Sequence, residues 1–282
     1  MDGNGGSAQP HDRRRVPHSR WVLKSSENRF VSRKNEIKAI LRPVYHTLCR
    51  TYLRTLIRTE RQLELMEHDW DKRARENARH FVATGKDNWT DEEFFASGER
   101  TVADHVLTDM VNVCQGKSPD RMRVLEIGCG AGRVTRALAR VFGEVHAVDV
   151  SGEMVRQARL ALNQYPNAKV YQNNGMDLSV IPALPFDFAF SALVFQHIPS
   201  YRIIGNYVRE THRLLVSGGL FKFQVRGNTA DKSKANQTWV GIPISDQQAV
   251  NFANECGFEA RYRVGAGTLE FWLWFFKRDR PS

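Results

Sequence analysis

Cysteines are few in this sequence, and they lie far apart. Cys49, Cys114, Cys129 and Cys256 show no CxxC spacing, so the pattern predicts neither a disulfide framework nor a zinc site. Unpaired thiols are typical of proteins kept in a reducing compartment. We therefore expect a cytoplasmic location.

Long apolar runs are also missing. No stretch of about eighteen consecutive apolar residues occurs, so we expect no membrane span. The opening stretch, MDGNGGSAQPHDRRRVPHSR, has no apolar core of the kind that a secretory signal requires. Its Gly, Pro, Ser and Arg content predicts a disordered basic tail over residues 1–30. The overall composition, 41% apolar and 26% charged, is that of a globular protein.

Acidic residues are scarce in the segment from Arg13 to Arg61, which we call the basic arm. It contains 14 Lys or Arg residues against three acids, so it accounts for the net charge of +10. Four arginines recur at helical spacing, Arg50, Arg54, Arg58 and Arg61. Apolar residues would form a stripe on the opposite side of such a helix. One interpretation is a helix packed on the enzyme body or on a second subunit of a homodimer. The other is docking onto nucleic acid or an anionic membrane surface.

A helical extension is predicted over residues 31–100, before any strand. Thr90 and Glu93 have the spacing of a capping box, which predicts a helix start. A further helix is expected at about 98–113. The sequence after residue 101 then alternates between apolar runs and helical patterns, which predicts an α/β domain over residues 101–282.

The most informative stretch, VLEIGCGAGRVTRALARVFGEVHAVDVS, spans Val124–Ser151. A buried-strand pattern runs into Gly128, Gly130 and Gly132, and a helical pattern and a second strand ending in Asp149 follow. Glycines at a strand-to-helix turn let the backbone approach a ligand where a Cβ would clash. An acid about twenty residues later accepts hydrogen bonds from ribose hydroxyls. The stretch therefore predicts a nucleotide or nucleoside pocket.

Two residues favour a cationic ligand over a dinucleotide. Arg133 occupies the place of the third glycine in the dinucleotide fingerprint GxGxxG. Glu126 lies two residues before the first glycine, where its carboxylate would repel a diphosphate and would suit ammonium and sulfonium groups. The pattern ExGxGxG followed by Asp149 resembles the signature of the Rossmann-like (class I) S-adenosylmethionine (SAM)-dependent methyltransferases.

This resemblance implies a fold and a cofactor. The fold is an α/β, Rossmann-like, seven-stranded and mostly parallel sheet with an antiparallel last strand and helices on both faces. The last two apolar runs are too close for a helical crossover, which independently favours an antiparallel return. Further strands are expected at 145–150, 169–172, 186–191, 220–225, from 258 onward, and at 268–277.

SAM is the expected cofactor, and the resemblance implies which residues hold it. Asp149 would bind the ribose, and Asp177, in the turn after the third strand, would bind the adenine. Ser191 and Ala192, at the end of the fourth strand, would lie near the methionine portion. The expected contacts are Glu126, Gly128, Cys129, Gly130, Gly132, Asp149, Val150, Met154, Gly175, Met176, Asp177, Ser191 and Ala192.

His197 is the candidate catalytic residue, because a positioned imidazole takes a proton from a hydroxyl or amine. The alternative is that His197 caps or packs the following helix. Arg226 and Trp239 lie in or beside a polar loop after the fifth strand, and they are candidates for contact with the substrate.

The helical extension is expected to act as a lid over the cofactor, because relatives of this family place their pre-sheet segment there. Trp70, Asn77 and Arg79 within it are interpreted as packing or surface residues.

Three functions remain open from the sequence. The first is a SAM-dependent methyltransferase that acts on a small molecule or biosynthetic intermediate, without a metal. The second is a binding or scaffold protein of the same fold, and the third is an RNA or protein methyltransferase that docks through the basic arm. The glycines, Glu126 and Asp149 together favour an enzyme, because a scaffold needs no complete pocket. The sequence does not identify the acceptor atom.

Overall fold

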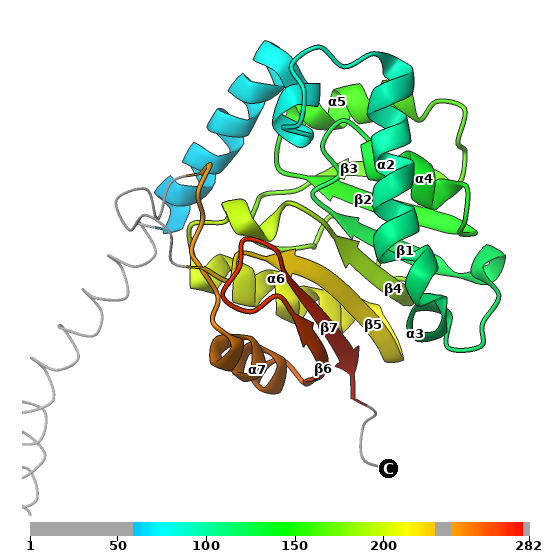
Figure 1. The fold of residues 1–282 in the computed structure, drawn as a ribbon, viewed down its shortest axis with the longest axis vertical. Coiled ribbons are helices and arrows are strands. Elements are labelled where there is room, and N and C mark those ends of the chain that lie inside the picture. Colours follow the sequence, from blue (N-terminus) through cyan, green and yellow to red (C-terminus); the bar gives the residue numbers. More distant parts are fainter. Residues whose placement is uncertain (1–58, 229–237, 279–282) are drawn as a thin grey trace, which may run out of the picture. The chain divides into compact units, whose positions relative to one another are not determined.

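The computed structural model describes residues 59–228 and 238–278 (Figure 1). They belong to one compact unit, Arg58–Ser282. Residues 59–100, which the sequence predicts as an extension, are therefore part of the same unit as the sheet. The predicted tail over 1–30 lies outside the described residues. So do Arg50, Arg54 and Arg58 of the basic arm, and the predicted structure of that segment stays a prediction.

The described residues form a seven-stranded sheet in the order β3-β2-β1-β4-β5-β7-β6. Strands β1 to β5 pair in parallel, and β7 is antiparallel to both β5 and β6. This arrangement confirms the predicted fold, including the antiparallel last strand. The strands are β1 Arg123–Ile127, β2 Glu144–Asp149, β3 Ala168–Gln172, β4 Phe186–Ser191, β5 Leu215–Val225, β6 Phe258–Val264 and β7 Phe271–Lys277.

Helices connect the strands, and several begin where the sequence predicts. The Thr90 side chain accepts a hydrogen bond from the Glu93 N–H, and the Glu93 carboxylate accepts one from the Thr90 N–H, so the capping box is confirmed. Ser245 caps the last helix in the same way. The helices are α2 Asp91–His105, α3 Met110–Cys114, α4 Arg133–Ala139, α5 Gly152–Ala161, α6 Tyr201–Leu214 and α7 Asp246–Glu255, with short turns η1 Leu107–Asp109, η2 Pro119–Arg121 and η3 Phe195–His197.

The prediction of a single helix at about 98–113 is wrong. Helix α2 ends at His105, and the chain continues through η1 into α3. The break puts the Asp109 carboxylate 2.8 Å from Lys222 Nζ and 2.5 Å from Trp274 Nε1. Because Lys222 is buried, this ion pair with Asp109 supplies the counter-charge that it needs. A contact with distant strands thus overrides the local helical pattern.

Strand β5 is longer than the predicted 220–225. Its pairing with β4 moves from Leu215 to Leu220 while β4 advances only from Phe186 to Phe188. Gly218, with φ +74°, lies in this irregular stretch. The irregular stretch around Gly218 therefore forms a bulge within the strand.

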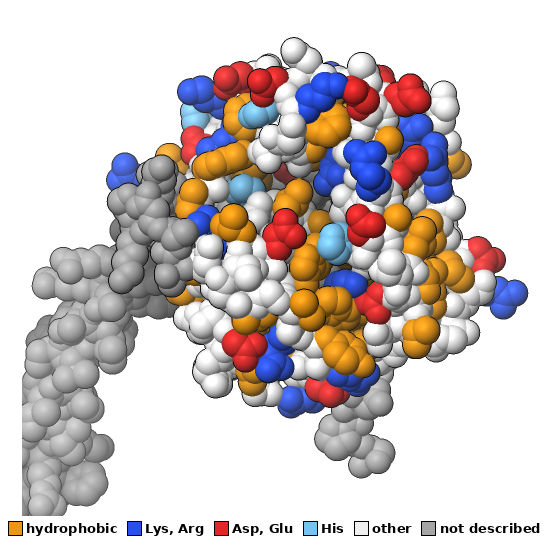
Figure 2. Space-filling view, viewed as in Figure 1, with side chains coloured by type: hydrophobic (Ala, Val, Ile, Leu, Met, Phe, Trp, Pro, Cys, Tyr) orange, Lys and Arg blue, Asp and Glu red, His pale blue; other side chains and the backbone are white. Residues whose placement is uncertain are grey.

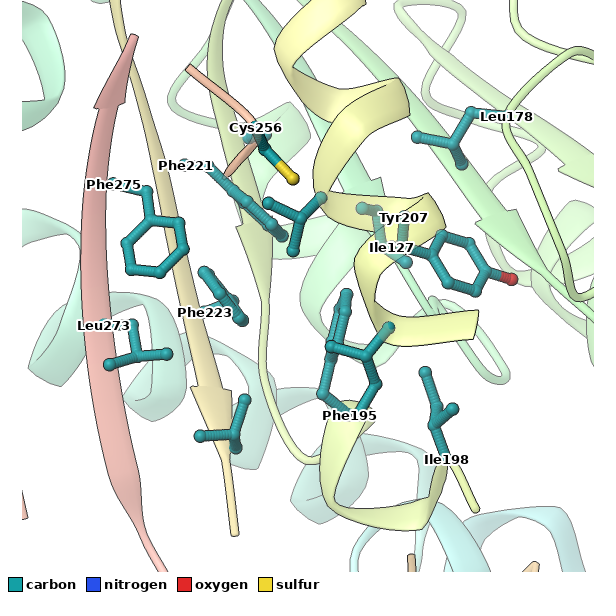
Figure 3. Close-up of a cluster of buried hydrophobic side chains, with 14 of the residues drawn as sticks. Ile127, Leu178, Phe195, Ile198, Tyr207, Phe221, Phe223, Cys256, Leu273 and Phe275 are labelled. Carbon is teal, nitrogen blue, oxygen red and sulfur yellow. The ribbon is translucent and has the colours of Figure 1, made fainter. Parts of the chain in front are cut away.

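Two hydrophobic layers flank the sheet. Helices α6 and α7 pack on one face, where the rings of Phe195, Phe221 and Phe223 lie in the core (Figure 3). Helices α2, α3 and α4 pack on the other face, against residues such as Phe188 and Phe190. The helices therefore cover both faces, which leaves the carboxyl edge of the parallel strands as the place for a ligand.

Residues 59–82 form a helix that crosses this carboxyl edge, at the blue-to-cyan end of the described chain (Figure 1). Its side chains form hydrogen bonds with segments at or beyond the ends of β2, β3, β4 and β5. These bonds join Asp71 to Ser151, Glu67 to Gln172, Gln62 to Pro199 and Arg73 to Thr238. In the described ranges, no helix is both long enough and apolar enough to cross a membrane.

Candidate functional site

A cavity of about 390 Å³ lies between the carboxyl edge of the sheet and the 59–82 helix. Two groups of residues line it. We call the first the glycine half, which comprises Glu126, Gly128, Gly130, Asp149 and Asn173. We call the second the aromatic half, which comprises Trp70, Phe81, His197, Arg226 and Trp239.

The glycine loop after β1 has no room for side chains. A Cβ on Gly128 would lie 2.2 Å from Val194 Cγ2, and a Cβ on Gly130 would lie 2.6 Å from Val82 Cγ2. Both residues have positive φ, +77° and +52°. Gly132 is also left-handed, but it packs against Ala158 and does not line the cavity. The first two glycines thus shape the cavity, and the third lets α4 pack.

Asp149 ends β2 and holds the glycine loop. Its Oδ2 accepts the Gly130 N–H at 2.9 Å, and its Oδ1 accepts the Ser151 N–H at 2.9 Å. Burial raises the pKa of Asp149, while these backbone hydrogen bonds oppose the increase. Each carboxylate oxygen can accept at least two hydrogen bonds, so both oxygens can still accept one from a ribose hydroxyl.

Glu126 lies in β1 with its side chain buried, 3% exposed. Its Oε2 has no hydrogen-bond partner among the described residues. Burial raises the pKa of Glu126 to about 7. A buried carboxylate oxygen without a partner is costly, and a cationic ligand in the cavity would supply the missing partner. The residues present therefore fit SAM, whose amino acid portion carries an ammonium group.

Asn173, and not Asp177, lines the cavity in the turn after β3. The Asp177 carboxylate accepts the Ser179 N–H at 3.0 Å and the Ser179 hydroxyl at 2.6 Å, which keeps it within its own turn. Asn173 Nδ2 donates to the Tyr207 hydroxyl at 2.7 Å, while Asn173 Oδ1 has no partner in the part of the chain that the structure describes. An exocyclic amino group of adenine would suit that free acceptor.

The remaining predicted cofactor residues divide into two groups. Cys129, Val150, Met154 and Ala192 line the cavity, as Glu126, Gly128, Gly130 and Asp149 do. Gly175, Met176 and Ser191 are not in its wall. The buried Ser191 hydroxyl donates to the Ile127 carbonyl at 2.7 Å, so it joins β4 to β1 instead.

The aromatic half brings together rings from three separate segments. The ring centroids of Trp70 and His197 are 5.2 Å apart, those of His197 and Trp239 are 5.0 Å apart, and those of Phe81 and Trp239 are 5.7 Å apart. Trp70, which the sequence suggests as a packing or surface residue, also lines the cavity. Periodicity did not reveal this, because a core ring and a ligand-facing ring follow the same helical spacing.

The side chains of Asn77 and Arg79 form hydrogen bonds with the backbone of the nearby segment 87–89 and do not line the cavity. Asn77 Nδ2 donates to the Asp87 carbonyl at 2.9 Å, and Arg79 Nη1 donates to the Trp89 carbonyl at 3.0 Å. Arg226 and Trp239, the two candidates for substrate contact, both line the cavity.

A chain of hydrogen bonds fixes the ring of His197. The Leu193 N–H donates to Gln224 Oε1 at 2.9 Å, and Gln224 Nε2 donates to Gln196 Oε1 at 3.1 Å. Gln196 Nε2 then donates to His197 Nε2 at 3.2 Å, and His197 Nδ1–H donates to the Trp239 carbonyl at 2.6 Å. A backbone donor at one end and a backbone acceptor at the other determine every donor and acceptor in the chain.

Both nitrogens of His197 therefore have partners, and its tautomer is defined. Burial lowers the pKa of His197 to about 4, so the ring is neutral at pH 7. A ring with so low a pKa is a weak base, and the arrangement favours a positioning role that holds Trp239 in the wall.

Comparisons with known proteins show a methyltransferase domain in this chain. Residues 124–219 match the family described as "Methyltransferase domain". The ubiquinone biosynthesis O-methyltransferase of Xanthomonas oryzae pv. oryzae is 32% identical over 98 residues, which are 34% of this chain and 40% of that protein. The biotin biosynthesis bifunctional protein of Bordetella avium is 51% identical over 47 residues, 16% of this chain and 10% of that protein. This chain thus spans less than half of the length of these curated relatives.

Solved structures show the same fold. Magnesium protoporphyrin IX methyltransferase from Synechocystis, crystallised with bound S-adenosylhomocysteine (SAH), aligns with a TM-score of 0.57 and 15% identity, covering 77% of this chain and 99% of that one. A putative sarcosine dimethylglycine methyltransferase from Galdieria sulphuraria aligns with a TM-score of 0.51 and 17% identity, covering 66% and 87%.

The sheet order and the glycine loop together define a Rossmann-like fold of class I. With the family match, residues 124–219 form a SAM-dependent methyltransferase domain.

Proposed function

We propose that this protein transfers the methyl group of SAM to a small molecule bound in the aromatic half of the cavity. The observation that carries the proposal is Glu126 Oε2, a buried carboxylate oxygen without a partner among the described residues, in the wall of the glycine half. The cavity wall carries two carboxylates here, those of Glu126 and Asp149, against one guanidinium, that of Arg133. Because the carboxylates outnumber the cation, this half disfavours the pyrophosphate of a dinucleotide and favours a ligand with ammonium and hydroxyl groups.

Each residue of the glycine half has a part in binding. Asp149 would accept hydrogen bonds from the ribose hydroxyls, Glu126 would pair with the ammonium group, and Asn173 Oδ1 would accept from the adenine. Gly128 and Gly130 leave the room that the ligand needs. When bound, SAM supplies an electrophilic methyl group on a positively charged sulfur. The remaining task of the protein is to hold an acceptor close to that methyl group and to exclude water.

The 59–82 helix would exclude that water. Met66 and Trp70 on this helix line the cavity, and Asp71 Oδ1 accepts from the Ser151 hydroxyl at 2.6 Å and from the Glu153 N–H at 3.1 Å. These bonds attach the helix to the first turn of α5, directly after Asp149. We therefore infer that the helix is a lid over the cofactor, in agreement with the role expected from the sequence.

A labelled-methyl assay tests the proposed function. The protein is incubated with SAM that carries a radiolabelled methyl group and with separate pools of metabolites, RNA and proteins. We expect label in the metabolite fraction. Label in no pool, from a protein that binds SAM, would favour the scaffold alternative, and label in RNA or protein would contradict a small-molecule acceptor.

A second candidate function is docking onto nucleic acid or an anionic membrane, for which the basic arm would be the contact surface. On the face shown in Figure 2, acidic and basic side chains of the described residues are interspersed. By residue count, the arm has 14 Lys or Arg against three acids and so accounts for the net charge of +10. The test compares RNA and anionic vesicle binding of the wild type with a variant in which Arg50, Arg54, Arg58 and Arg61 are all Gln, at two salt concentrations. We expect no salt-dependent binding, because the arm's apolar stripe calls for a protein surface, the enzyme body or a second subunit. Salt-sensitive binding that the variant loses would support docking.

We also propose a cytoplasmic location, because the three cysteines in the described ranges, Cys114, Cys129 and Cys256, are all free thiols. No group of three or more His, Cys, Asp or Glu side chains in those ranges is arranged to hold a metal ion.

A further inference from the structure

The aromatic half of the cavity presents a continuous surface of rings. Trp70, Phe81, His197 and Trp239 all line the cavity, and each ring contacts at least one other of the set at centroid distances of 5.0 to 6.1 Å. Aromatic faces gain most when the partner is another flat ring, stacked or edge-on. The shape of this wall therefore favours a flat ligand.

The wall is held rigid from behind. The Arg73 guanidinium lies 4.9 Å from the Trp70 ring centroid and 5.3 Å from that of Trp239. Arg73 Nη2 also donates to Thr238 Oγ1 at 3.2 Å, and His197 Nδ1–H holds the Trp239 carbonyl at 2.6 Å. A rigid wall loses little conformational entropy when a ligand binds.

The charge of this half is opposite to that of the glycine half. Arg226 lines the cavity, and the two charged side chains that act on the His197 ring are both cationic, Arg73 and Arg226. Glu270 also lines the cavity, but it is exposed to solvent, and its charge acts on His105, which stacks on Trp272 outside the cavity wall. Solvent screens that exposed carboxylate. Asp69 lies beside Arg73 and offsets part of its charge, so the positive charge of this half depends chiefly on Arg226 in the cavity wall.

We propose that the aromatic half binds a flat aromatic acid as its anion, with the ring against Trp239 and Trp70 and the anionic group beside Arg226. A cationic amine would be repelled by the Arg226 guanidinium, and a saturated acid would lose the contact of ring with ring. This inference rests on the proposed function in one respect, that such a ligand is the methyl acceptor. The binding preference itself rests only on the wall and its charge.

The test measures the binding of four matched probes to the full chain by calorimetry, in the presence of saturating SAH. The probes are 2-naphthoate, its neutral amide, its fully saturated analogue decahydro-2-naphthoate, and the cationic 2-naphthylmethylamine. We expect 2-naphthoate to bind about tenfold more tightly than the amide, as a hydrogen bond to a charged group would give. We expect the saturated acid to bind about fivefold more weakly than 2-naphthoate, and the amine to bind most weakly.

Two pairs of variants test which residues are responsible. Arg226→Gln should remove most of the preference for the acid over the amide, whereas Arg202→Gln, on an exposed residue of α6 outside the cavity wall, should leave it unchanged. Trp239→Leu should reduce the preference for the flat acid over the saturated one, and Trp239→Phe should retain most of it. Thermal melting of each variant confirms that it is folded.

Three results would overturn the proposal. These are equal binding of the acid and the amine, equal binding of the flat and saturated acids, and an unchanged acid preference in a folded Arg226→Gln protein. SAH binding to the same samples separates this inference from the proposed function. If SAH binds and no aromatic acid does, only this inference fails. If SAH itself does not bind, the proposed function fails.

Discussion

The two halves of the cavity are built in different ways. The glycine half comes mainly from one continuous stretch, from Glu126 to Asp149, where backbone turns, the buried Glu126 carboxylate and the partly buried Asp149 carboxylate form the wall. The aromatic half comes from the 59–82 helix, η3, the end of β5 and the segment before α7, and side-chain rings form its wall. In the first half two carboxylates face one guanidinium, that of Arg133, and in the second the Arg226 guanidinium lies in the wall. Under the two proposals, one cavity would hold a cationic cofactor and an anionic acceptor next to each other.

The largest effect is expected from Gly130→Val, because the glycine half depends on its backbone turn. A side chain at this position would collide with Val82 and would occupy a left-handed conformation that β-branched residues avoid. We expect a folded protein with no measurable SAH binding by calorimetry. Gly116→Val is the matched control, since Gly116 also has positive φ (+86°) but no atom within 4 Å of the new Cβ. Normal SAH affinity in a folded Gly130→Val protein would show that the loop is only a structural turn.

The next largest effect is expected from Asp149→Ala. It removes the acceptor for the ribose hydroxyls and a brace of the glycine loop, so SAH binding should weaken by about 1.5–3 kcal/mol. Asp177→Ala is the control that distinguishes the structure from the sequence-based expectation. Because the Asp177 carboxylate is engaged by Ser179, its loss should leave SAH affinity nearly unchanged. If Asp177→Ala weakens binding as much as Asp149→Ala does, the described wall is incorrect.

A smaller effect, with a defined pH dependence, is expected from Glu126. Its pKa is raised from an ordinary 4.5 to about 7 in the folded protein, so the carboxylate ionises mainly above pH 7. Affinity for SAM should thus increase by about tenfold between pH 6 and pH 8. Glu126→Gln should remove this dependence. A wild-type affinity that is flat over this range would contradict the pairing of Glu126 with the ammonium group.

The same shift has a consequence for the stability of the ligand-free protein. The folded state binds more protons than the unfolded state between pH 4.5 and pH 7, so this contribution to stability is present below 4.5 and is lost as pH increases through 7. Urea titrations at pH 5 and pH 8 should show that Glu126→Gln weakens the pH dependence of the free energy of unfolding.

The smallest effect is expected from the titration of His197, which tests the aromatic half. Burial and the two nearby guanidinium groups keep its pKa at about 4. Nuclear magnetic resonance of the ¹⁵N-labelled imidazole should show a neutral ring, protonated at Nδ1, with no titration between pH 5.5 and pH 8. The His197→Ala protein provides the assignment. A midpoint near 6.5 would contradict the hydrogen-bond chain and would restore His197 as a general base.

The sequence predicted the sheet well, and it singled out four of the five residues that define the glycine half, because both follow from local patterns. The glycine spacing, Glu126 and Asp149 lie within one strand–helix–strand unit, where a turn and its ligand-facing groups are set by neighbouring residues. The short gap between the last two apolar runs likewise required the antiparallel β7. The breaks in these patterns came from distant contacts, such as the pairing of Asp109 with Lys222 that ends α2.

The aromatic half was predicted only in part, for a physical reason. Arg226 and Trp239 were found because they lie near a loop at the carboxyl edge. Trp70 was missed as a cavity residue because it comes from a helix far away in the sequence. In the glycine half, the sequence singled out Asp177 and not Asn173, since nothing local shows that Ser179 engages the Asp177 carboxylate. The chain through Gln196 and Gln224 joins residues 28 positions apart, which no periodicity reveals.

Calorimetry of the wild-type chain with SAM and with NAD tests the central claim most directly. The two carboxylates of the glycine half predict one-site binding of SAM and no heat with NAD, because NAD carries a diphosphate that Glu126 would repel. Binding of NAD without binding of SAM would contradict the account.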